Sequence, residues 1–86
     1  MHEMSVALDI CRIAREHVPE EQIGNVVEVG VELGDEAGLE PENLAFCLEA
    51  LLTEPPFRHA KPAITRLPGE ALRVTYVEVD DDRPDY

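Results

Sequence analysis

The stretch NVVEVGVEL, Asn25–Leu33, decides the fold of this chain. Its apolar residues alternate with Glu28, Gly30 and Glu32, and this period of two is typical of a strand with one buried face. The buried face is predicted to consist of Val27, Val29, Val31 and Leu33. The other face is acidic or bare, and a glycine inside a strand indicates either a bulge or a close backbone approach.

An amphipathic helix is predicted before this strand. From about Glu3 to His17 apolar residues recur at helical spacing, and Pro19 ends the pattern. The stripe consists of Met4, Ala7, Leu8, Cys11, Ala14 and Val18, with Val6, Ile10 and Ile13 beside it. Residues 20–24 then form a polar connection to the strand.

A second helix is predicted after the strand, from Pro41 to about Leu52. Proline suits the first position of a helix, and the Pro55-Pro56 pair prevents its continuation. Its apolar stripe consists of Leu44, Cys47, Leu48 and Leu51, with Ala45, Phe46 and Leu52 alongside.

Two further strands are predicted, at residues 63–67 and 71–79, and the turn dipeptide Pro68-Gly69 between them favours a hairpin. Alternation in the second is imperfect, because Leu72, Val74 and Tyr76 share one face while Val77 and Val79 share the other. That strand is therefore central, or bulged, or its second face meets another surface. The order of elements predicts a two-layer α+β domain, with two helices packed on one face of a three-stranded β-sheet. Residues 1–79 are expected to form a single domain, and residues 80–86 are expected to be an acidic disordered tail.

Composition excludes several classes of function. The 86 residues carry a formal charge of −12, which opposes binding to nucleic acid and to anionic membranes. Neither a membrane span nor a signal peptide is indicated, so a cytoplasmic location is expected. The two cysteines lie in apolar helical patterns and are expected to be buried rather than paired in a disulfide. There is no nucleophile with a base and no cofactor motif, so the chain is not expected to be an enzyme.

The first two residues, Met1-His2, point to a metal. The terminal amine, the His2 backbone nitrogen and the His2 imidazole are three nitrogen donors within one short covalent loop. Once the amide is deprotonated, they favour the tetragonal geometry of Ni(II) and Cu(II), and the donors do not distinguish these two ions. The other histidines have simpler explanations: His17 complements the C-terminal end of the first helix dipole, and His59 lies in a solvated basic loop.

The opening Met1-His2-Glu3-Met4-Ser5-Val6 resembles that of the HypA/HybF family, which helps to insert nickel into [NiFe]-hydrogenases and ureases. The elements are similar too, through residues 26–34, 39–46, 63–65 and 72–79. The resemblance implies nickel bound by the Met1 amine, His2 and the backbone at Glu3, with a weaker assignment of Glu40. In place of the family's zinc ribbon the chain has only the residues 66–70, RLPGE, so no structural zinc is expected.

The function expected from the donors and the resemblance is that of a nickel-binding metallochaperone for [NiFe]-hydrogenase maturation. Its partner would be a maturation GTPase or the hydrogenase large subunit, and the sheet could also support a homodimer. The alternative is a protein–protein adaptor that retains the HypA-like fold but has lost metal delivery along with the zinc lobe. A sheet face with Val77 and Val79 exposed would favour the adaptor.

Overall fold

The computed structural model describes residues 2–80 of the chain. Its elements are α1 (Glu3–Glu16), the 3₁₀ helix η1 (Glu20–Asn25), β1 (Val26–Gly34), α2 (Pro41–Leu52), β2 (Lys61–Leu67) and β3 (Leu72–Val79). Both predicted helices are confirmed, while the expected polar connection forms η1 and the strand predicted at 63–67 begins two residues earlier. Most of the predicted acidic tail lies outside the described residues. Its first residue, Asp80, donates its backbone N–H to the carbonyl of Asn25 at 3.0 Å.

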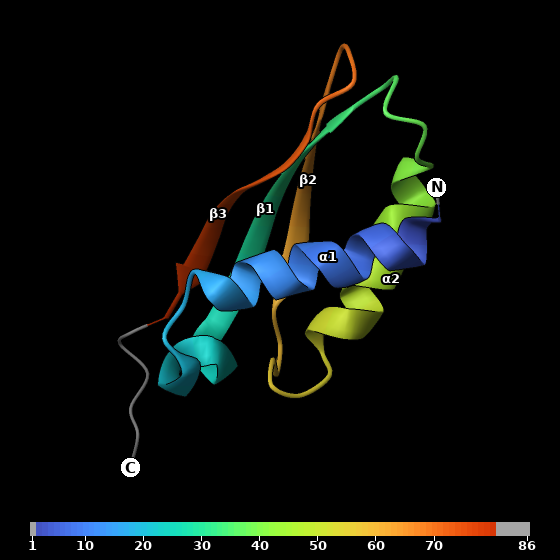
Figure 1. Ribbon diagram of the computed structural model, residues 1–86. Helices are drawn as coiled ribbons and strands as arrows, with labels where there is room; N and C mark the ends of the chain where they lie inside the picture. Colours follow the sequence, from blue (N-terminus) through green and yellow to red (C-terminus); the bar gives the residue numbers. More distant parts are fainter. Residues whose placement is uncertain (1, 81–86) are drawn as a thin grey trace.

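The three strands form one mixed sheet with the order β2-β1-β3, and both helices lie on the same face of it (Figure 1). Helix α1 crosses the sheet on the side of β3, and α2 lies beside α1 and contacts β2. The predicted two-layer α+β architecture is confirmed. No helix within residues 2–80 is long and apolar enough to cross a membrane.

The core lies between the central strand β1 and the two helices. Val29, Val31 and Leu33 are buried, as their alternation predicts. The largest side chains that meet them from α2 are Leu44, Leu48 and Leu52. Three residues assigned to or beside the helical stripes are exposed instead: Met4, Leu8 and, at 69% of its surface, Phe46. The stripes are therefore narrower than predicted, because each helix has only one neighbouring helix and one sheet face to bury against.

The predicted hairpin between the last two strands is wrong. β1 lies between them, parallel to β2 and antiparallel to β3. This order pairs the most deeply buried strand on both of its sides, so that its buried backbone groups are satisfied. The loop at residues 68–71 therefore spans the end of β1 instead of forming a tight turn between neighbours (Figure 1).

Gly34 makes that crossing possible. Its N–H donates to the carbonyl of Ala71 at 2.6 Å, and a Cβ on Gly34 would lie 2.2 Å from the carbonyl oxygen of Gly69. The next two residues also donate hydrogen bonds, Asp35 to Leu67 at the end of β2 at 2.7 Å and Glu36 to Gly69 in the loop at 2.7 Å. Only a residue without a side chain fits where the loop lies this close to β1.

A β-bulge explains the imperfect alternation of the last strand. Gly30 pairs with Tyr76 and Val31 pairs with Val74, so Thr75 is an extra residue in β3. The bulge brings Val74 to the same face as Val77 and Val79, all three packed against the core and half-buried. The prediction that Tyr76 shares a face with Val74 is wrong, and so is the exposed valine face that favoured the adaptor.

On the outer face of the sheet, which points away from the helices, the side chain of Tyr76 covers Gly30. The ring of Tyr76 lies over this glycine, where a Cβ would come within 2.1 Å of it, and the Tyr76 hydroxyl donates to Glu28. The register therefore shifts directly after Gly30, and the group that approaches this glycine closely is the side chain of Tyr76. A second shift makes Val27 an extra residue in β1, so Val26 is buried where Val27 was predicted to be.

Candidate metal centre

The N-terminus of α1 lies beside that of α2 (Figure 1). His2 is the residue that caps α1; it is exposed and extended, and its imidazole makes no capping hydrogen bond. Its carbonyl accepts the first helical hydrogen bond, from the N–H of Val6 at 3.2 Å. The His2 backbone is thus fixed by the helix on its carbonyl side, while the imidazole is free to bind a ligand. Met1, whose amine is the first predicted donor, lies outside the described residues.

Glu3 joins the two helix N-termini. One oxygen of its carboxylate accepts the backbone N–H of Glu40 at 2.9 Å, and the other accepts the Asn43 side-chain amide at 3.0 Å. These bonds connect residues 37 and 40 positions apart in the sequence. We call this group of Glu3, Glu40 and Asn43 the Glu3 bridge.

The Glu3 bridge favours an ionised carboxylate. The hydrogen bond from the Glu40 backbone lowers the pKa of Glu3 most, followed by those from its own N–H and from Asn43. The partial positive charge at the start of α2 acts in the same direction. Glu3 is therefore negative at neutral pH and holds the first turn of α1 against α2.

Glu40 caps α2, which begins at Pro41. Its carboxylate accepts the backbone N–H of Glu42 at 2.9 Å, and its carbonyl accepts that of Leu44 at 2.9 Å. This arrangement satisfies two of the groups that a helix start leaves unpaired. The buried side chain of Leu39 anchors the preceding turn.

The His2 imidazole, rather than a carboxylate, is the free side chain at this junction. The first amides of a helix have no carbonyl partner within it, and Glu3 is the first residue of α1. The Glu3 amide is therefore next to His2 in the chain, and its N–H does not donate to a carbonyl of the helix. Both oxygens of Glu3, by contrast, already accept hydrogen bonds, and so does one of Glu40. The Glu3 carboxylate thus holds the first turn of α1 against the start of α2, next to the exposed imidazole of His2.

The structure places the other histidines far from this junction in the fold. His17 is exposed and caps the C-terminal end of α1, and His59 is exposed in the loop before β2. Among residues 2–80, no group of three or more histidine, cysteine, aspartate or glutamate side chains is arranged to hold a metal.

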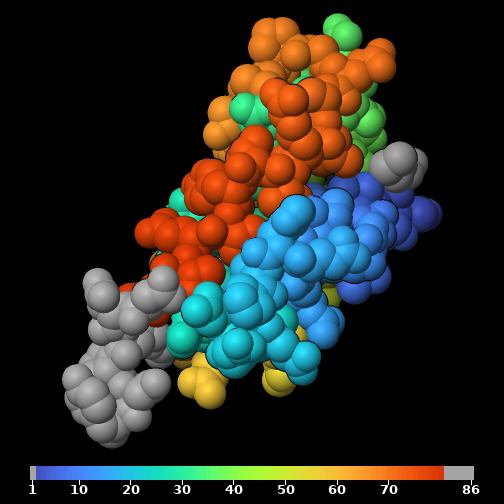
Figure 2. Space-filling model, turned by 60° about the vertical axis from the view of Figure 1, so that its left-hand side comes forward, coloured from blue at the N-terminus to red at the C-terminus, as the bar shows by residue number. Residues whose placement is uncertain are grey.

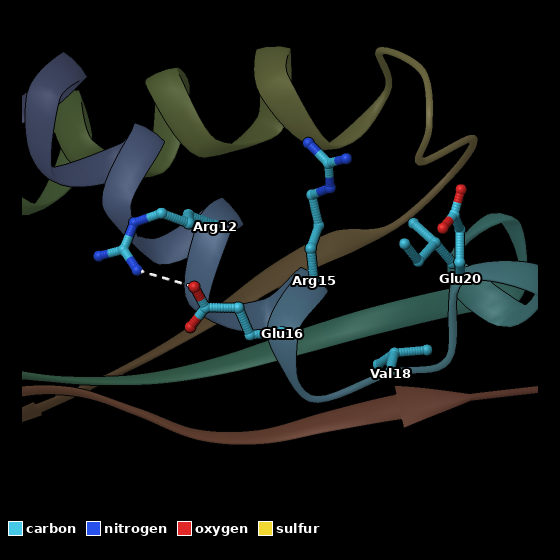
Figure 3. A pocket seen from close by; sticks show the side chains of 6 residues that line it. Arg12, Arg15, Glu16, Val18 and Glu20 are labelled. Atoms are coloured by element: carbon cyan, nitrogen blue, oxygen red, sulfur yellow. Dashed lines mark hydrogen bonds and ion pairs between the residues drawn. The ribbon is translucent and has the colours of Figure 1, made fainter.

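A hollow at the other end of α1 contains charged and apolar groups (Figure 3). Arg12 donates to Glu16 at 3.1 Å, and Arg15 projects from α1 toward the segment that follows α2. The rest of the lining is Val18, Glu20 and Ile23. No serine, cysteine or histidine lines this hollow.

Both cysteines are free and buried, as predicted. Burial raises the pKa of the Cys11 thiol to about 11, and the charge of Arg15 offsets only part of this. A thiol with so high a pKa remains protonated at neutral pH, and the thiolate is the form that binds metals. Cys11 is thus a core residue.

Asn43 is the residue that sequence reasoning missed. Its amide completes the Glu3 bridge, yet it stands 40 positions from Glu3 in the sequence, and periodicity does not show which helix ends meet. A polar residue in the first turn of α2, beside the Glu40 cap, was the only available signal.

The sequence is similar to those of known proteins. Residues 1–74 match the family model described as "Hydrogenase/urease nickel incorporation, metallochaperone, hypA". Among curated proteins, the chain is 32% identical over 71 residues to the hydrogenase maturation factor HypA of Albidiferax ferrireducens. It is 37% identical over 71 residues to the protein of the same name from Azotobacter chroococcum. Each match covers 83% of this chain and 63% of the relative, so the chain spans less than two thirds of the length of these relatives.

A solved structure has the same fold. The solution structure of the Ni metallochaperone HypA from Helicobacter pylori aligns with a TM-score of 0.74 at 15% identity, covering 92% of this chain and 97% of that one. At this identity the similarity shows the fold alone, and it confirms the α+β architecture predicted from the order of elements.

Proposed function

The chain belongs to the HypA family, and from this premise we propose that it is a metallochaperone that holds Ni(II) at its N-terminus and delivers it for [NiFe]-hydrogenase maturation. The observation that carries the proposal is the Glu3 bridge. It fixes the start of α1 against α2, while the exposed His2 imidazole makes no capping hydrogen bond. Because the backbone at the start of α1 is already fixed, less of it has to be ordered when an ion binds there.

The ligands would be nitrogen atoms. We assign the amine of Met1, the backbone nitrogen and imidazole of His2, and the backbone nitrogen of Glu3. This set suits the tetragonal geometry of Ni(II), and the carboxylates of Glu3 and Glu40 would position it. Because the amine, amides and imidazole must lose protons to bind, protons compete with the metal, and affinity should fall as the pH falls.

The chain would act by holding and transferring the ion, without catalysing a reaction and without a structural zinc. Residues 1–79 would act as a single nickel-binding domain in the cytoplasm, followed by the acidic tail at residues 80–86. The receiving partner would be a maturation GTPase or the hydrogenase large subunit. Self-association through the sheet would bring two such termini into one assembly.

Titration of tag-free protein with Ni(II), followed by calorimetry and visible absorption, tests the site. The wild type should bind one equivalent and develop a d–d band of square-planar type. His2→Ala should lose both, whereas His59→Ala, which removes another exposed imidazole, should behave as the wild type. Equal binding by His2→Ala and the wild type would contradict the assignment.

Loss of binding must be separated from loss of folding. His2 is exposed and its side chain makes no capping hydrogen bond, so His2→Ala should unfold at the same temperature as the wild type. For delivery, cells that lack their own nickel-insertion protein should regain hydrogenase activity with the wild type but not with His2→Ala. If hydrogenase activity returned with both the wild type and His2→Ala, nickel binding by His2 would not be needed for delivery, and the proposed mechanism would be contradicted.

A further inference from the structure

Strand β3 is an open edge of the sheet. It pairs with β1 on one side only, and Figure 2 shows its orange to red atoms as an uncovered stripe beside α1. The opposite edge, β2, contains Pro62, which has no N–H to donate, next to the exposed charge of Lys61. Proline and lysine are common means of protecting an edge against pairing. Strand β3 also has charged side chains and a bulge, but it contains no proline, so every one of its residues has a backbone N–H that can pair with another strand.

The bulge at Thr75 sets which side chains of β3 share a face. Without it, residues an odd number of positions apart would lie on opposite faces. With one extra residue, Val74 lies on the core face together with Val77, and Arg73 lies on the outer face together with Glu78. The register with β1 agrees, since Arg73 pairs with Glu32 and Glu78 pairs with Glu28 on that outer face.

The bulge also makes β3 complementary to itself. Around a point between Thr75 and Tyr76 the sequence LRVTYVEV places Leu72 opposite Val79, Arg73 opposite Glu78 and Val74 opposite Val77. In an antiparallel pair, residues that lie directly opposite each other must share a face. A regular strand could not satisfy this condition in this register, because the opposed positions are an odd number apart, whereas the bulged strand satisfies it for all three pairs.

We propose that the β3 edge is the interface of a symmetric homodimer, in which two copies of β3 pair antiparallel about a twofold axis between Thr75 and Tyr76. The two three-stranded sheets then form one continuous sheet with the helices of both copies on the same face. Such a twofold interface uses the same patch on each subunit and closes after two copies.

Charge supports a second copy as the occupant. Glu78 pairs in register with another carboxylate, Glu28, and within residues 2–80 no cation is recorded as its ion-pair partner. Arg73 contacts Glu32 through its Nε at 2.6 Å, which leaves its two terminal amino groups available. Across the twofold axis each Arg73 faces the Glu78 of the other copy, giving two opposite-charge pairs.

Apolar groups beside the edge support the same occupant. A hollow between α1 and β3 is lined in part by Ile13, Leu72 and Val74, and another lies along residues 74–77 next to His17. Leu72 remains 36% exposed in the single chain. Pairing with a second copy places Val79 of that copy opposite Leu72 and reduces this exposure.

Charge reversal at the two positions tests the proposal by sedimentation equilibrium and native mass spectrometry. Arg73→Glu places glutamates opposite each other, and Glu78→Arg places arginines opposite each other. Each variant alone should therefore dimerise at least about tenfold more weakly than the wild type. An equimolar mixture of the two variants restores both opposite-charge pairs between unlike chains. It should form a heterodimer with the affinity of the wild type.

The mixing experiment distinguishes two reasons why a variant could dimerise weakly: a changed interface and a defect within its own fold. Arg73→Glu also breaks the ion pair with Glu32, but mixing cannot repair an internal loss. Arg66→Glu, which breaks the comparable Arg66–Asp35 pair beside β2, is the matched control and should dimerise normally. A wild type that is monomeric at every concentration, single variants that dimerise like the wild type, or a mixture that stays monomeric would each overturn the proposal. None of these results depends on nickel, so the interface and the proposed metal site can fail separately.

Discussion

Replacement of Gly34 by alanine should destabilise the fold at the point where the β2–β3 loop crosses β1. The added Cβ would lie 2.2 Å from the carbonyl oxygen of Gly69 and 2.7 Å from the backbone nitrogen of Ala71. Carbon and carbonyl oxygen normally approach no closer than about 3.3 Å, so the loop must move by about 1 Å. Both obstructing groups are backbone, so a change of rotamer cannot relieve the contact.

The cost follows from the hydrogen bonds that this movement breaks. The loop and the adjoining end of β2 accept hydrogen bonds from the N–H groups of Gly34, Asp35 and Glu36 at 2.6 to 2.7 Å. With a net value of roughly 0.5 to 1.5 kcal/mol for each bond, losing two or three of them costs about 1 to 4 kcal/mol. The lower entropy of alanine in the unfolded chain returns about 0.4 to 1 kcal/mol. We therefore expect a loss of about 2 kcal/mol, or a fall in melting temperature of about 8 to 16 °C for a domain of this size.

Thermal and urea unfolding followed by circular dichroism measure this loss. Gly24→Ala is the matched control, because a Cβ there meets only the flexible side chain of Arg58, at 3.4 Å. Its unfolding free energy should stay within about 0.5 kcal/mol of the wild type. If Gly34→Ala proved as stable as Gly24→Ala, the close crossing of the loop over β1 would be refuted.

Three further predictions concern titratable groups and their partners. The pKa of Glu3 in the folded chain lies below its ordinary value of 4.5, so the ionised carboxylate stabilises the fold above pH 4.5, and this stabilisation is lost as the pH falls through the lower folded pKa. Glu3→Gln should therefore be less stable than the wild type at neutral pH, and the difference should shrink in acid. Unfolding curves recorded across this pH range measure the difference. Cys11, with its pKa raised to about 11, should resist iodoacetamide in the native protein at mildly alkaline pH and react once urea unfolds it, which mass spectrometry measures; rapid native labelling would contradict its burial. Gly30→Ala should push the Tyr76 ring away from Glu28, whose hydrogen bond is the main cause of the raised pKa of Tyr76. NMR titration of this variant should therefore find the Tyr76 pKa closer to its ordinary value of 10.0. An unchanged pKa would argue against the packing of this ring on Gly30.

The sequence was a good guide to the elements and a poor one to their neighbours. Period-two and helical spacing identify which face of an element is apolar, and they place β1, α1 and α2 within one or two residues of their observed bounds. They do not show which strands pair, so Pro68-Gly69 suggested a hairpin where the loop in fact crosses β1. The decisive contact, between Gly34 and Gly69, joins residues that no local pattern connects.

Bulges account for the remaining errors in the sheet. An extra residue shifts the alternation by one position, so Val26 is buried in place of Val27, and Val74 lies with Val77. The mixed pattern of LRVTYVEV allowed a bulge but could not place it. The structure places it at Thr75, and that position makes the strand complementary to itself.

For the proposed metal site, the first residues predict the candidate donor atoms, but they do not predict the hydrogen bonds that hold the first turn of α1 in place. The covalent neighbours Met1, His2 and Glu3 predict a set of nitrogen ligands, which is the site we propose. The Glu3 bridge to Glu40 and Asn43 depends on how two helices meet, which only the packing of α1 on α2 decides.

The most direct test of the N-terminal nickel site is to block the terminal amine alone. Chains with a free and with an acetylated N-terminus, prepared with otherwise identical sequence, would be titrated with Ni(II) while the visible d–d absorption is recorded. If the site is built from terminal nitrogens, the free chain binds one equivalent with a square-planar spectrum and the acetylated chain loses both the band and the tight binding, although its unfolding curve is unchanged. Equal nickel binding and equal spectra for the two chains would show that the amine is not a ligand and would contradict the central claim.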